Sequence, residues 1–570
     1  MIPRLAARGK LVVASALLFL LAGALHGAPP LVGIAGVVLC ALLAAYLAFY
    51  PTAILLRRKK IELSWWVPPG DQPGGALAAV RPFALHLAFR NHGSRPLRIL
   101  HTQILASSGL DVLERPQASV APGNQVEITA QVRPRHAGYQ VFHGAALTLG
   151  DPLGLFDVEA YFPNPIAIKV FPRALSARQQ AVRPLGGALH EAVGLHQVKR
   201  RGHAGELREL REHAHGDPFK FIAWKATARK RRLMVRDVES EIVATQTLLV
   251  DIGASMRVGP PGTTPLDWAI DAASALARAA ATGGDRVGLC AFDTRRTVEL
   301  PPGSGHHHWL QLVDRLLDAR SIVDDDLTDV TAGELVAQVA RYLAHQEAID
   351  LRVRIAPPLD DPRWNGIQAG PDGQLYDLAA GSRLVKKLLE AMKLDQRRVA
   401  VPGWWWGRAQ QHAEADPQLA PLRLFCRLRG IELPYRTIPE HGARTRGLAQ
   451  AVEHVVAAGR PDAVILLSDL AGLAEDAPAL TRALARARRV AGSVVALVPD
   501  PAAFLPAASS ELGARVRALA VRDARAQAEL ARRLLARAGV RIVDVGPSDV
   551  PSRLLGRGQR GPGGQTRRAA

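Results

Sequence analysis

The stretch from Val243 to Ser255, VATQTLLVDIGAS, decides how the C-terminal half of this 570-residue chain folds. Leu248 to Val250 form a continuous apolar run that stops at Asp251. Such a run is typical of a strand that is covered on both faces in a parallel sheet. In open α/β sheets, ligands bind outside the carboxyl ends of the strands. We therefore expect Asp251 to Ser255 to lie at the functional edge of a sheet.

Strand and helix patterns alternate on both sides of a long interruption after this stretch. Before the interruption we expect a helix over Leu266 to Ala277 and strands over Val287 to Phe292 and Thr297 to Leu300. After it we expect a helix near Leu448 to Val456, strands at Ala463 to Leu467 and Ser493 to Val498, a helix from Arg525 to Ala538 and a strand from Val540 to Val545. This alternation predicts an α/β domain with a doubly wound parallel sheet.

The region from Ile61 to about Ala174 has the pattern of an all-β domain. Val126 to Arg133 alternates apolar and polar residues, which places one face of a strand in a core. Further short strands are expected at Phe83 to Phe89, Leu97 to Ile104, Phe142 to Leu149 and Ile166 to Phe171. They predict an antiparallel sandwich of immunoglobulin-like size, which serves as a spacer or interaction domain.

Two apolar runs, Leu11 to Leu25 and Leu31 to Leu56, open the chain. A membrane-spanning helix takes roughly 20 residues, so the second run is long enough, and the first becomes so with Gly27 and Ala28. The pair is flanked by cations at Arg4, Arg8, Lys10, Arg57, Arg58, Lys59 and Lys60. Positive flanks favour the cytoplasmic side. We therefore predict a multi-pass inner-membrane protein with the bulk of its chain in the cytoplasm and Arg57 to Lys60 at the lipid surface.

A cleaved signal peptide is the alternative for the first run, because Ala22-Gly-Ala24 has the form of a cleavage site. The second run and its four following cations would still stop transfer, with the remaining chain inside.

The formal net charge of +20 indicates either an arginine-rich surface that serves solubility or an anionic partner, which would be a membrane surface or nucleic acid. Aromatic residues make up only 5% of the chain, and the arginines are dispersed along helices. Stacking platforms for bases are therefore not expected, and nucleic-acid binding would be nonspecific.

The cysteines Cys40, Cys290 and Cys426 are far apart, so no disulfide framework or paired-cysteine metal site is readable.

The segment GELRELREHAHGDPFKFIAWKATAR, which begins at Gly205, fits neither a simple helix nor a simple strand pattern. Together with GDPLGLF at Gly150 to Phe156 and the entry into LLVDIGASM, it resembles the bacterial family called domain of unknown function 58. The likeness extends from Gly150 to Ser304 and from Arg444 to about Val545. It implies a membrane-anchored protein with a von Willebrand factor A-like domain. The alternative for the segment's mixed charges is a salt-bridged surface.

The same resemblance implies a metal-ion-dependent adhesion site, with the pattern Asp-x-Ser-x-Ser followed by a Thr and an Asp on two later loops. Asp251, Ser255, Thr445 and Asp469 match this pattern, with Asp469 following Ser468 directly after a strand, and Gly253 stands where the middle Ser is expected. Thr331 is an alternative to Thr445. Oxygen ligands of this kind suit Mg²⁺ or Mn²⁺. The alternative is a polar sheet edge whose carboxylates cap loops and helix starts.

The predicted domain organisation has seven parts. These are a membrane anchor at 1–60, a β-sandwich at 61–175, a connector with the signature segment at 176–240, the A-like domain at 241–343 and 441–550, an insertion at 344–440 and a disordered tail at 551–570. The insertion is too long for an ordinary loop and is expected to carry structure of its own, with a helix at Leu384 to Met392 and a Trp404 to Trp406 run.

No nucleophile paired with a base is readable, so the leading hypothesis is a scaffold that binds a protein partner and is not an enzyme. Members of the similar family commonly accompany MoxR-type AAA+ ATPases, which the resemblance therefore implies as the partner. A nonspecific nucleic-acid-binding membrane protein is the first alternative. A metal-dependent hydrolase using His306 to His308 is the second, although these residues are expected in a loop. Asp324 to Asp326 are expected at a helix start or in a solvated acidic patch.

Overall fold

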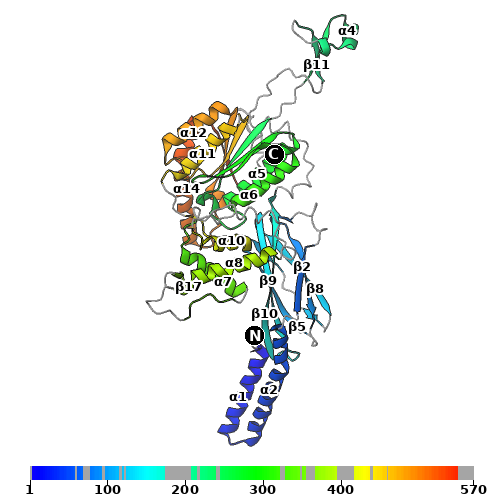
Figure 1. The fold of residues 1–570 in the computed structure, drawn as a ribbon, viewed down its shortest axis with the longest axis vertical. Helices are drawn as coiled ribbons and strands as arrows, with labels where there is room; N and C mark the ends of the chain where they lie inside the picture. The colour runs from blue at the N-terminus through cyan, green and yellow to red at the C-terminus, as the bar shows by residue number, and fades with distance from the viewer. Residues whose placement is uncertain are drawn as a thin grey trace, which may run out of the picture. The chain divides into compact units, whose positions relative to one another are not determined.

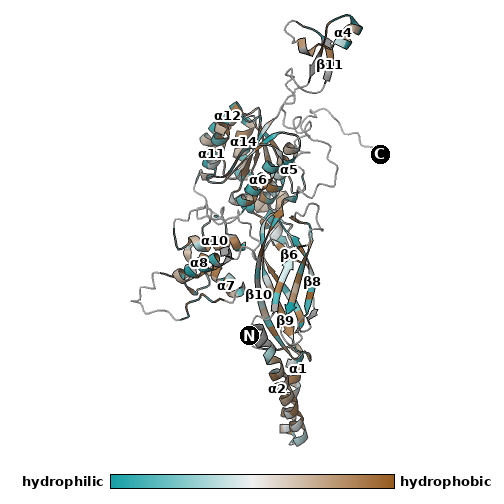
Figure 2. Cartoon of the chain, turned by 45° about the vertical axis from the view of Figure 1, so that its right-hand side comes forward, coloured by the Kyte–Doolittle hydropathy of each residue, from teal (hydrophilic) through white to brown (hydrophobic). Residues whose placement is uncertain are grey.

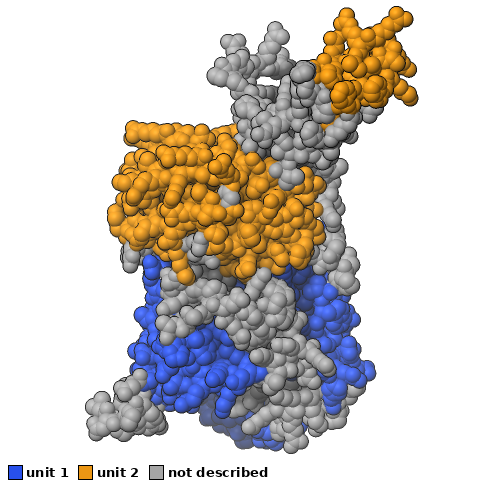
Figure 3. Space-filling model, turned by 45° about the horizontal axis from the view of Figure 1, so that its top comes forward, with its two compact units in different colours: residues 1–173, 321–437 blue, residues 174–320, 438–570 orange. Residues whose placement is uncertain are grey.

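A computed structural model describes residues 3–57, 61–67, 77–92, 97–113, 118–120, 124–173, 207–214, 219–238, 244–320, 328–346, 349–354, 366–394, 416–436, 441–458 and 460–549. The chain divides into two compact units (Figure 3). Unit 1 comprises Met1–Arg173 with Ser321–Thr437, and unit 2 comprises Ala174–Arg320 with Ile438–Ala570. Several predicted features lie outside the described residues: the first part of the connector, at 176–206, the acidic run at 324–326, the tryptophan run at 404–406 and the tail at 551–570.

Unit 1 begins with two apolar helices, α1 (Ala7–Leu25) and α2 (Pro29–Arg57), that pack against one another. Gly27 joins them in a left-handed conformation, with φ of 60°. Their surfaces are predominantly hydrophobic (Figure 2). The spans Ala7–Leu25 and Pro29–Pro51 are long and apolar enough to cross a membrane. The cations at 58–60 lie outside the described residues.

Two sheets follow, and their facing side chains form one hydrophobic cluster. The first contains, in order, β1 (Arg4–Leu5), β10 (Phe156–Phe171), β9 (Gly138–Gly150), β5 (Leu97–Ala106) and β7 (Ala118–Val120), with β3 (Leu77–Ala78) parallel to β10. The second contains β2 (Ile61–Trp66), β4 (Phe83–Asn91), β8 (Gln125–Pro134) and β6 (Leu110–Val112). The four strands predicted between Phe83 and Phe171 correspond to β4, β5, β9 and β10, and β8 alternates in burial as expected.

The GDPLGLF motif joins the apolar helices to these sheets. The Asp151 carboxylate is buried and accepts hydrogen bonds from the backbone N–H groups of Leu155 and Phe156, at 2.6 and 2.8 Å. The Leu155 carbonyl then accepts the N–H of Ala6 at 2.9 Å. The Phe156 ring packs edge-on against Tyr46 of α2, with ring centroids 5.5 Å apart. The motif therefore fixes a tight turn against which the helices pack.

The interrupting segment belongs to unit 1, where it starts at Ser321, earlier than the predicted boundary at residue 344. It contains α7 (Ala332–Gln346), β16 (Ile367–Ala369), β17 (Leu375–Asp377), α8 (Leu378–Leu394) and α10 (Ala420–Arg429). These elements share a core of their own, which also packs against Tyr139 and Ala167 of the first sheet. The segment accordingly has structure of its own, and its helix α8 covers the one predicted at Leu384 to Met392.

Unit 2 is built on a six-stranded sheet in the order β15 (Arg296–Gly303), β14 (Arg286–Phe292), β13 (Thr245–Asp251), β18 (Ala463–Leu467), β19 (Ser493–Pro499) and β20 (Arg541–Val545). All neighbours are parallel except β15, which runs antiparallel to β14. Helices α5 (Pro265–Thr282) and α6 (Gly305–Arg320) lie on one face, and α11 (Ala443–Ala458), α12 (Ala477–Val490) and α14 (Glu511–Arg537) lie on the other (Figure 1). The sequence predicted every strand of this sheet.

His306 to His308 are in the first turn of α6, so the prediction of a loop was wrong. Helix α6 forms because Trp309, Leu312 and Leu316 follow at helical spacing and are buried. The His308 ring donates from Nε2 to the Val287 carbonyl at 2.6 Å, which ties the helix start to β14.

The signature segment forms a small module of unit 2. Strands β11 (Leu207–Glu212) and β12 (Met234–Val238) pair antiparallel, and a 3₁₀ turn η3 (Phe219–Phe221) and helix α4 (Trp224–Lys230) lie between them in the chain. Ile222, Ala223, Met234 and Val235 are buried and form the inside of the module. Arg231 ends α4 in the left-handed conformation, with φ of 54°.

Candidate functional site

The candidate site lies at the carboxyl edge of the unit 2 sheet, where three chain segments meet. β13 pairs with β18 such that Val250 lies opposite Leu467. Asp251 and Ser468, the next residues of the two strands, therefore emerge side by side at the sheet edge. The start of α11 supplies the third segment. As expected from the sequence, the end of VATQTLLVDIGAS is at this edge.

The Asp251 side chain is fully buried and satisfied by neighbours from all three segments. Its Oδ1 accepts the backbone N–H of Gly253 at 2.9 Å. Its Oδ2 accepts the Ser468 hydroxyl at 2.6 Å and an N–H of Arg444 at 2.5 Å. A buried carboxylate is stable only with such a set of donors, because burial removes its hydration.

Arg444, in the first turn of α11, is at the centre of the cluster. Its Nη1 donates to the Ser255 hydroxyl at 2.8 Å and to the Ala471 carbonyl at 2.5 Å. Its Nη2 contacts Asp251 and also Asp469 Oδ1, at 3.4 Å. The guanidinium side chain is only 7% exposed. Arg444 thus binds the oxygens of three residues that the sequence assigned to a metal.

Thr445, the fourth residue of the predicted metal site, forms its hydrogen bond with the segment after β18 and not with Arg444. Its buried hydroxyl donates to the Leu473 carbonyl at 2.8 Å, which holds α11 against the segment after β18. The alternative, Thr331, is in unit 1 and caps the start of α7, where its backbone N–H donates to Glu334 at 2.8 Å.

The electrostatics of the cluster are those of a buried ion pair. Burial alone would lower the pKa of Arg444, but the carboxylates of Asp251, Asp469 and Asp293 outweigh it and raise that pKa above its usual value. For Asp469, burial raises the carboxyl pKa, and the opposing effect of Arg444 only partly compensates. Arg444 is therefore a permanent cation.

This arrangement does not fit a divalent ion as the sequence predicted it. An octahedral Mg²⁺ needs the side-chain oxygens of Asp251, Ser255 and Asp469 to face the ion, and here all three contact the guanidinium. Among the described residues, no group of three or more His, Cys, Asp and Glu side chains could hold a metal ion. The metal site remains a prediction from the family resemblance.

Arg444 is the functional residue that the sequence did not reveal. An arginine in the first turn of a helix suggests a solvated side chain, and only its partners in space show otherwise. The available signal was the mismatch at Gly253, which left a predicted metal site short of one ligand.

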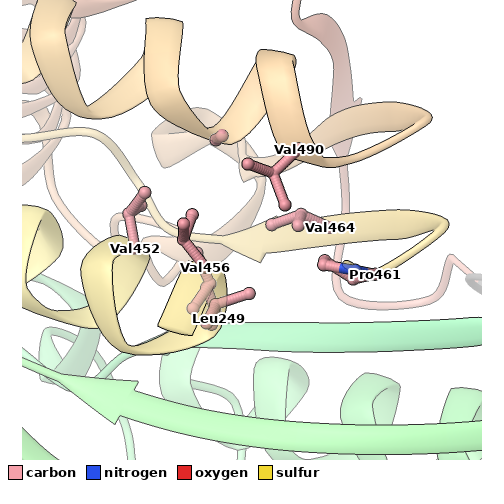
Figure 4. Close-up of a pocket in the computed structure, with 8 residues that line it drawn as sticks. Leu249, Val452, Val456, Pro461, Val464 and Val490 are labelled. Carbon is pink, nitrogen blue, oxygen red and sulfur yellow. The ribbon is translucent and has the colours of Figure 1, made fainter. Parts of the chain in front are cut away.

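A cavity on one face of the sheet is a poor alternative site. It lies between the sheet and the helices α11 and α12, and its eight lining side chains are all apolar (Figure 4). Leu249, Val452 and Val464 point into it from β13, α11 and β18. Such a cavity offers no polar group to orient a ligand.

A family model described as "Protein of unknown function DUF58" matches residues 209–344. The match confirms the predicted family resemblance over a segment that begins in the signature module and continues through β13, α5, β14, β15 and α6 to α7. It does not extend to Arg444.

The curated relatives are mycobacterial proteins. "Uncharacterized protein Mb1516" from Mycobacterium bovis and "Uncharacterized protein Rv1480" from Mycobacterium tuberculosis are each 29% identical over 124 residues. These matches cover 22% of this chain and 38% of each relative, so the chain aligns with well under half of their length.

Solved structures give only weak likenesses. Escherichia coli alpha-2-macroglobulin, from domain MG7 to the C-terminus, is 12% identical with a TM-score of 0.16, covering 87% of this chain and 61% of that chain. A FixG-related protein from Vibrio parahaemolyticus is 9% identical with a TM-score of 0.14, covering 20% of this chain and 97% of that chain. Neither score supports an argument about fold or function.

Proposed function

We propose that this protein is a membrane-anchored scaffold whose unit 2 binds a protein partner through the signature module. In this proposal α1 and α2 span the inner membrane and the rest of the chain is cytoplasmic. The protein acts by binding and not by turnover. The carrying observation is that aromatic and basic side chains are exposed on this small module.

The aromatic side chains Phe219 and Trp224 of the module are 76% and 67% exposed. The module already has its own interior, formed by smaller residues such as Ile222 and Met234. The two rings are therefore not needed for that interior. Large exposed aromatic side chains are typical of binding anchors, since burying them against a partner removes much apolar area from water.

Basic side chains follow Trp224 in the chain. Lys225, Arg229, Lys230 and Arg231 are all exposed in or next to α4. Glu212 of β11 pairs with Arg232 at 2.8 Å. The exposed cations and aromatic rings favour a partner whose surface combines acidic residues with an apolar pocket. Complementary charges speed the encounter of the two proteins, and burial of the rings stabilises the complex.

The sheet edge supports the same function by holding the loops of unit 2 in one arrangement. Arg444 joins the segments after β13 and after β18 to α11. A rigid body lowers the entropic cost of binding. The resemblance stated above implies a MoxR-type AAA+ ATPase as the partner.

Co-purification tests the proposal. The full chain, tagged and cross-linked in native membranes, is expected to recover a specific protein, and Phe219→Ala with Trp224→Ala is expected to reduce that recovery at least tenfold. The matched control is Leu512→Ala with Val516→Ala, which removes two exposed apolar side chains from α14 of the same unit. Equal recovery by both double variants would contradict the assignment of the surface.

The identity of the recovered material separates the alternatives. An AAA+ ATPase would support the implied partner, and another protein would retain the scaffold function with a different partner. Recovery of nucleic acid alone, lost at moderate salt, would favour the nonspecific alternative.

A further inference from the structure

The oxygens that the family pattern assigns to a metal ion surround a side chain of this protein. Asp251 Oδ2, Ser255 Oγ and Asp469 Oδ1 are at 2.5, 2.8 and 3.4 Å from the two terminal nitrogens of Arg444. They come from two separate loops, while the arginine comes from α11. The guanidinium thus occupies the common centre of these oxygens.

We propose that Arg444 is a built-in cation that replaces the divalent metal at this sheet edge, so that the edge neither binds nor needs Mg²⁺ or Mn²⁺. The exchange is chemically reasonable. A guanidinium carries one positive charge and five N–H donors in a plane, so it can neutralise a carboxylate and tie several oxygens together.

Gly253 supports this inference independently of the hydrogen bonds. A Cβ atom added at this residue would lie 3.0 Å from Cζ, Nε and Nη2 of Arg444. That separation is below the usual contact of about 3.5 to 4.0 Å between carbon atoms. A serine at 253 would therefore push against the guanidinium. The absence of a serine at residue 253 is therefore linked to the presence of the Arg444 guanidinium, because the two would compete for the same space.

The remaining contacts of the cluster also suit a guanidinium better than a metal. Nη1 donates to the Ala471 carbonyl in addition to Ser255, and Ser468 donates its proton to Asp251. Each acceptor on this side of the cluster thus faces a donor. Because the guanidinium is covalently attached and stays charged at any physiological pH, the arrangement of the loops is independent of metal supply.

Manganese binding to the full chain in detergent micelles tests the proposal without any partner. The loss of the free Mn²⁺ signal in electron paramagnetic resonance reports binding directly. The wild-type protein is expected to bind no more Mn²⁺ than Asp251→Asn does. The double variant Gly253→Ser/Arg444→Gly, which restores the family pattern and removes the arginine, is expected to gain one saturable site that Asp251→Asn abolishes.

Two results would overturn the proposal. One is saturable Mn²⁺ binding by the wild-type protein that Asp251→Asn removes. The other is a double variant with the circular dichroism of the wild type that gains no Mn²⁺ site, because the arginine would then not be what replaces the ion. Should the double variant fail to fold, the wild-type titration decides. A failure of the partner experiment would leave both results unchanged.

Discussion

At the scale of single residues, the protein depends on a buried ion pair. Arg444 and Asp251 are 7% and 0% exposed, and their atoms approach to 2.5 Å. Moving two charges out of water is costly, and their attraction offsets this cost only when the remaining donors and acceptors are also satisfied. Gly253 and Ser468 supply the other hydrogen bonds of Asp251, whereas Arg444 Nε is buried without a hydrogen-bond partner among the described residues. The pair is therefore sensitive to the loss of either partner.

Arg444→Met is expected to destabilise unit 2 by about 3 to 5 kcal/mol, because it leaves the Asp251 carboxylate buried without its cation. Urea-dependent proteolysis, with cleavage products assigned to unit 2, measures this change. The control is Arg446→Met, two residues further along α11, where the side chain is exposed and donates to the His441 carbonyl. Its cost is expected to stay below about 1 kcal/mol. Equal costs for the two variants would show that the ion pair is not what stabilises the cluster.

The residue scale is also where the sequence was least informative. Asp251, Ser255 and Asp469 were correctly placed at one sheet edge, since the ends of parallel strands meet there. The sequence could not show that Arg444 enters among them. A side chain's neighbours across nearly 200 positions follow from packing and not from local pattern.

At the scale of secondary-structure elements, close packing of α11 positions Arg444. A Cβ atom added at Gly447 would lie 2.0 Å from the Asp293 carbonyl oxygen, so α11 contacts the backbone between β14 and β15 directly. Only a glycine permits this approach. The helix cannot move outward without carrying Arg444 away from Asp251.

Gly447→Ala is expected to destabilise unit 2 by about 1 to 3 kcal/mol, because the added methyl group forces α11 outward. Thermal unfolding of the full chain measures the effect. Gly513→Ala is the matched control, since this residue in the first turn of α14 has no atom closer than 3.2 Å to an added Cβ. That substitution is expected to be neutral or stabilising by up to about 1 kcal/mol. A destabilisation at Gly513 as large as that at Gly447 would refute the packing argument.

A second contact between elements joins the interrupting segment to the first sheet of unit 1. Tyr342 of α7 hydrogen-bonds the His143 ring of β9 at 2.8 Å. Burial, together with nearby Arg429, lowers the pKa of His143 to about 3. The folded protein therefore keeps this ring neutral at pH values where an unfolded histidine, with a pKa of about 6.5, takes up a proton.

This difference in the pKa of His143 between the folded and unfolded protein predicts that the folded protein loses stability as the pH falls. Between about pH 6.5 and pH 3 only the unfolded chain binds the proton, so unfolding becomes easier by up to about 1.4 kcal/mol per pH unit. The wild type is expected to lose more stability than His143→Gln between pH 7 and pH 5, as followed by urea unfolding of unit 1. An identical loss in both proteins would mean that His143 titrates normally.

The helices and strands that could be predicted from the sequence are those in which one hydrophobic pattern repeats over the whole element. The apolar strands β13, β14 and β18 and the alternating strand β8 satisfy this condition. Helix α6 was not predicted, although Trp309 and Leu312 follow the three histidines at helical spacing. The GDPLGLF turn was recognised only as a motif, since its capping by Asp151 depends on backbone geometry.

At the scale of the whole molecule, the chain passes between the two units three times, after Arg173, Arg320 and Thr437. The apolar helices belong to unit 1, and the sheet edge and signature module belong to unit 2. The change of hydrophobic pattern along the chain predicted that several domains exist. That pattern could not show that the interrupting segment packs on the first sheet, because His143 and Tyr342, which meet there, are distant in sequence and neither carries a signal for the other.

A topology reporter tests the predicted membrane arrangement. Fluorescent protein fused after Ala570 is expected to be bright, and alkaline phosphatase at the same position inactive, because the positive flanks hold both ends of the helical hairpin in the cytoplasm. Phosphatase fused within the turn at Gly27 is expected to be active. The reverse pattern would place the body of the protein outside the cytoplasm.

Site-specific photo-cross-linking at residue 219 tests the central claim, that the signature module docks a protein partner, most directly. A benzophenone amino acid replaces Phe219 in the full chain, and native membranes are irradiated. The account predicts one discrete protein adduct that is absent when the same label replaces Leu512 and persists in the presence of a chelator. Irradiation that yields only lipid adducts, or the same protein adducts from both positions, would contradict it.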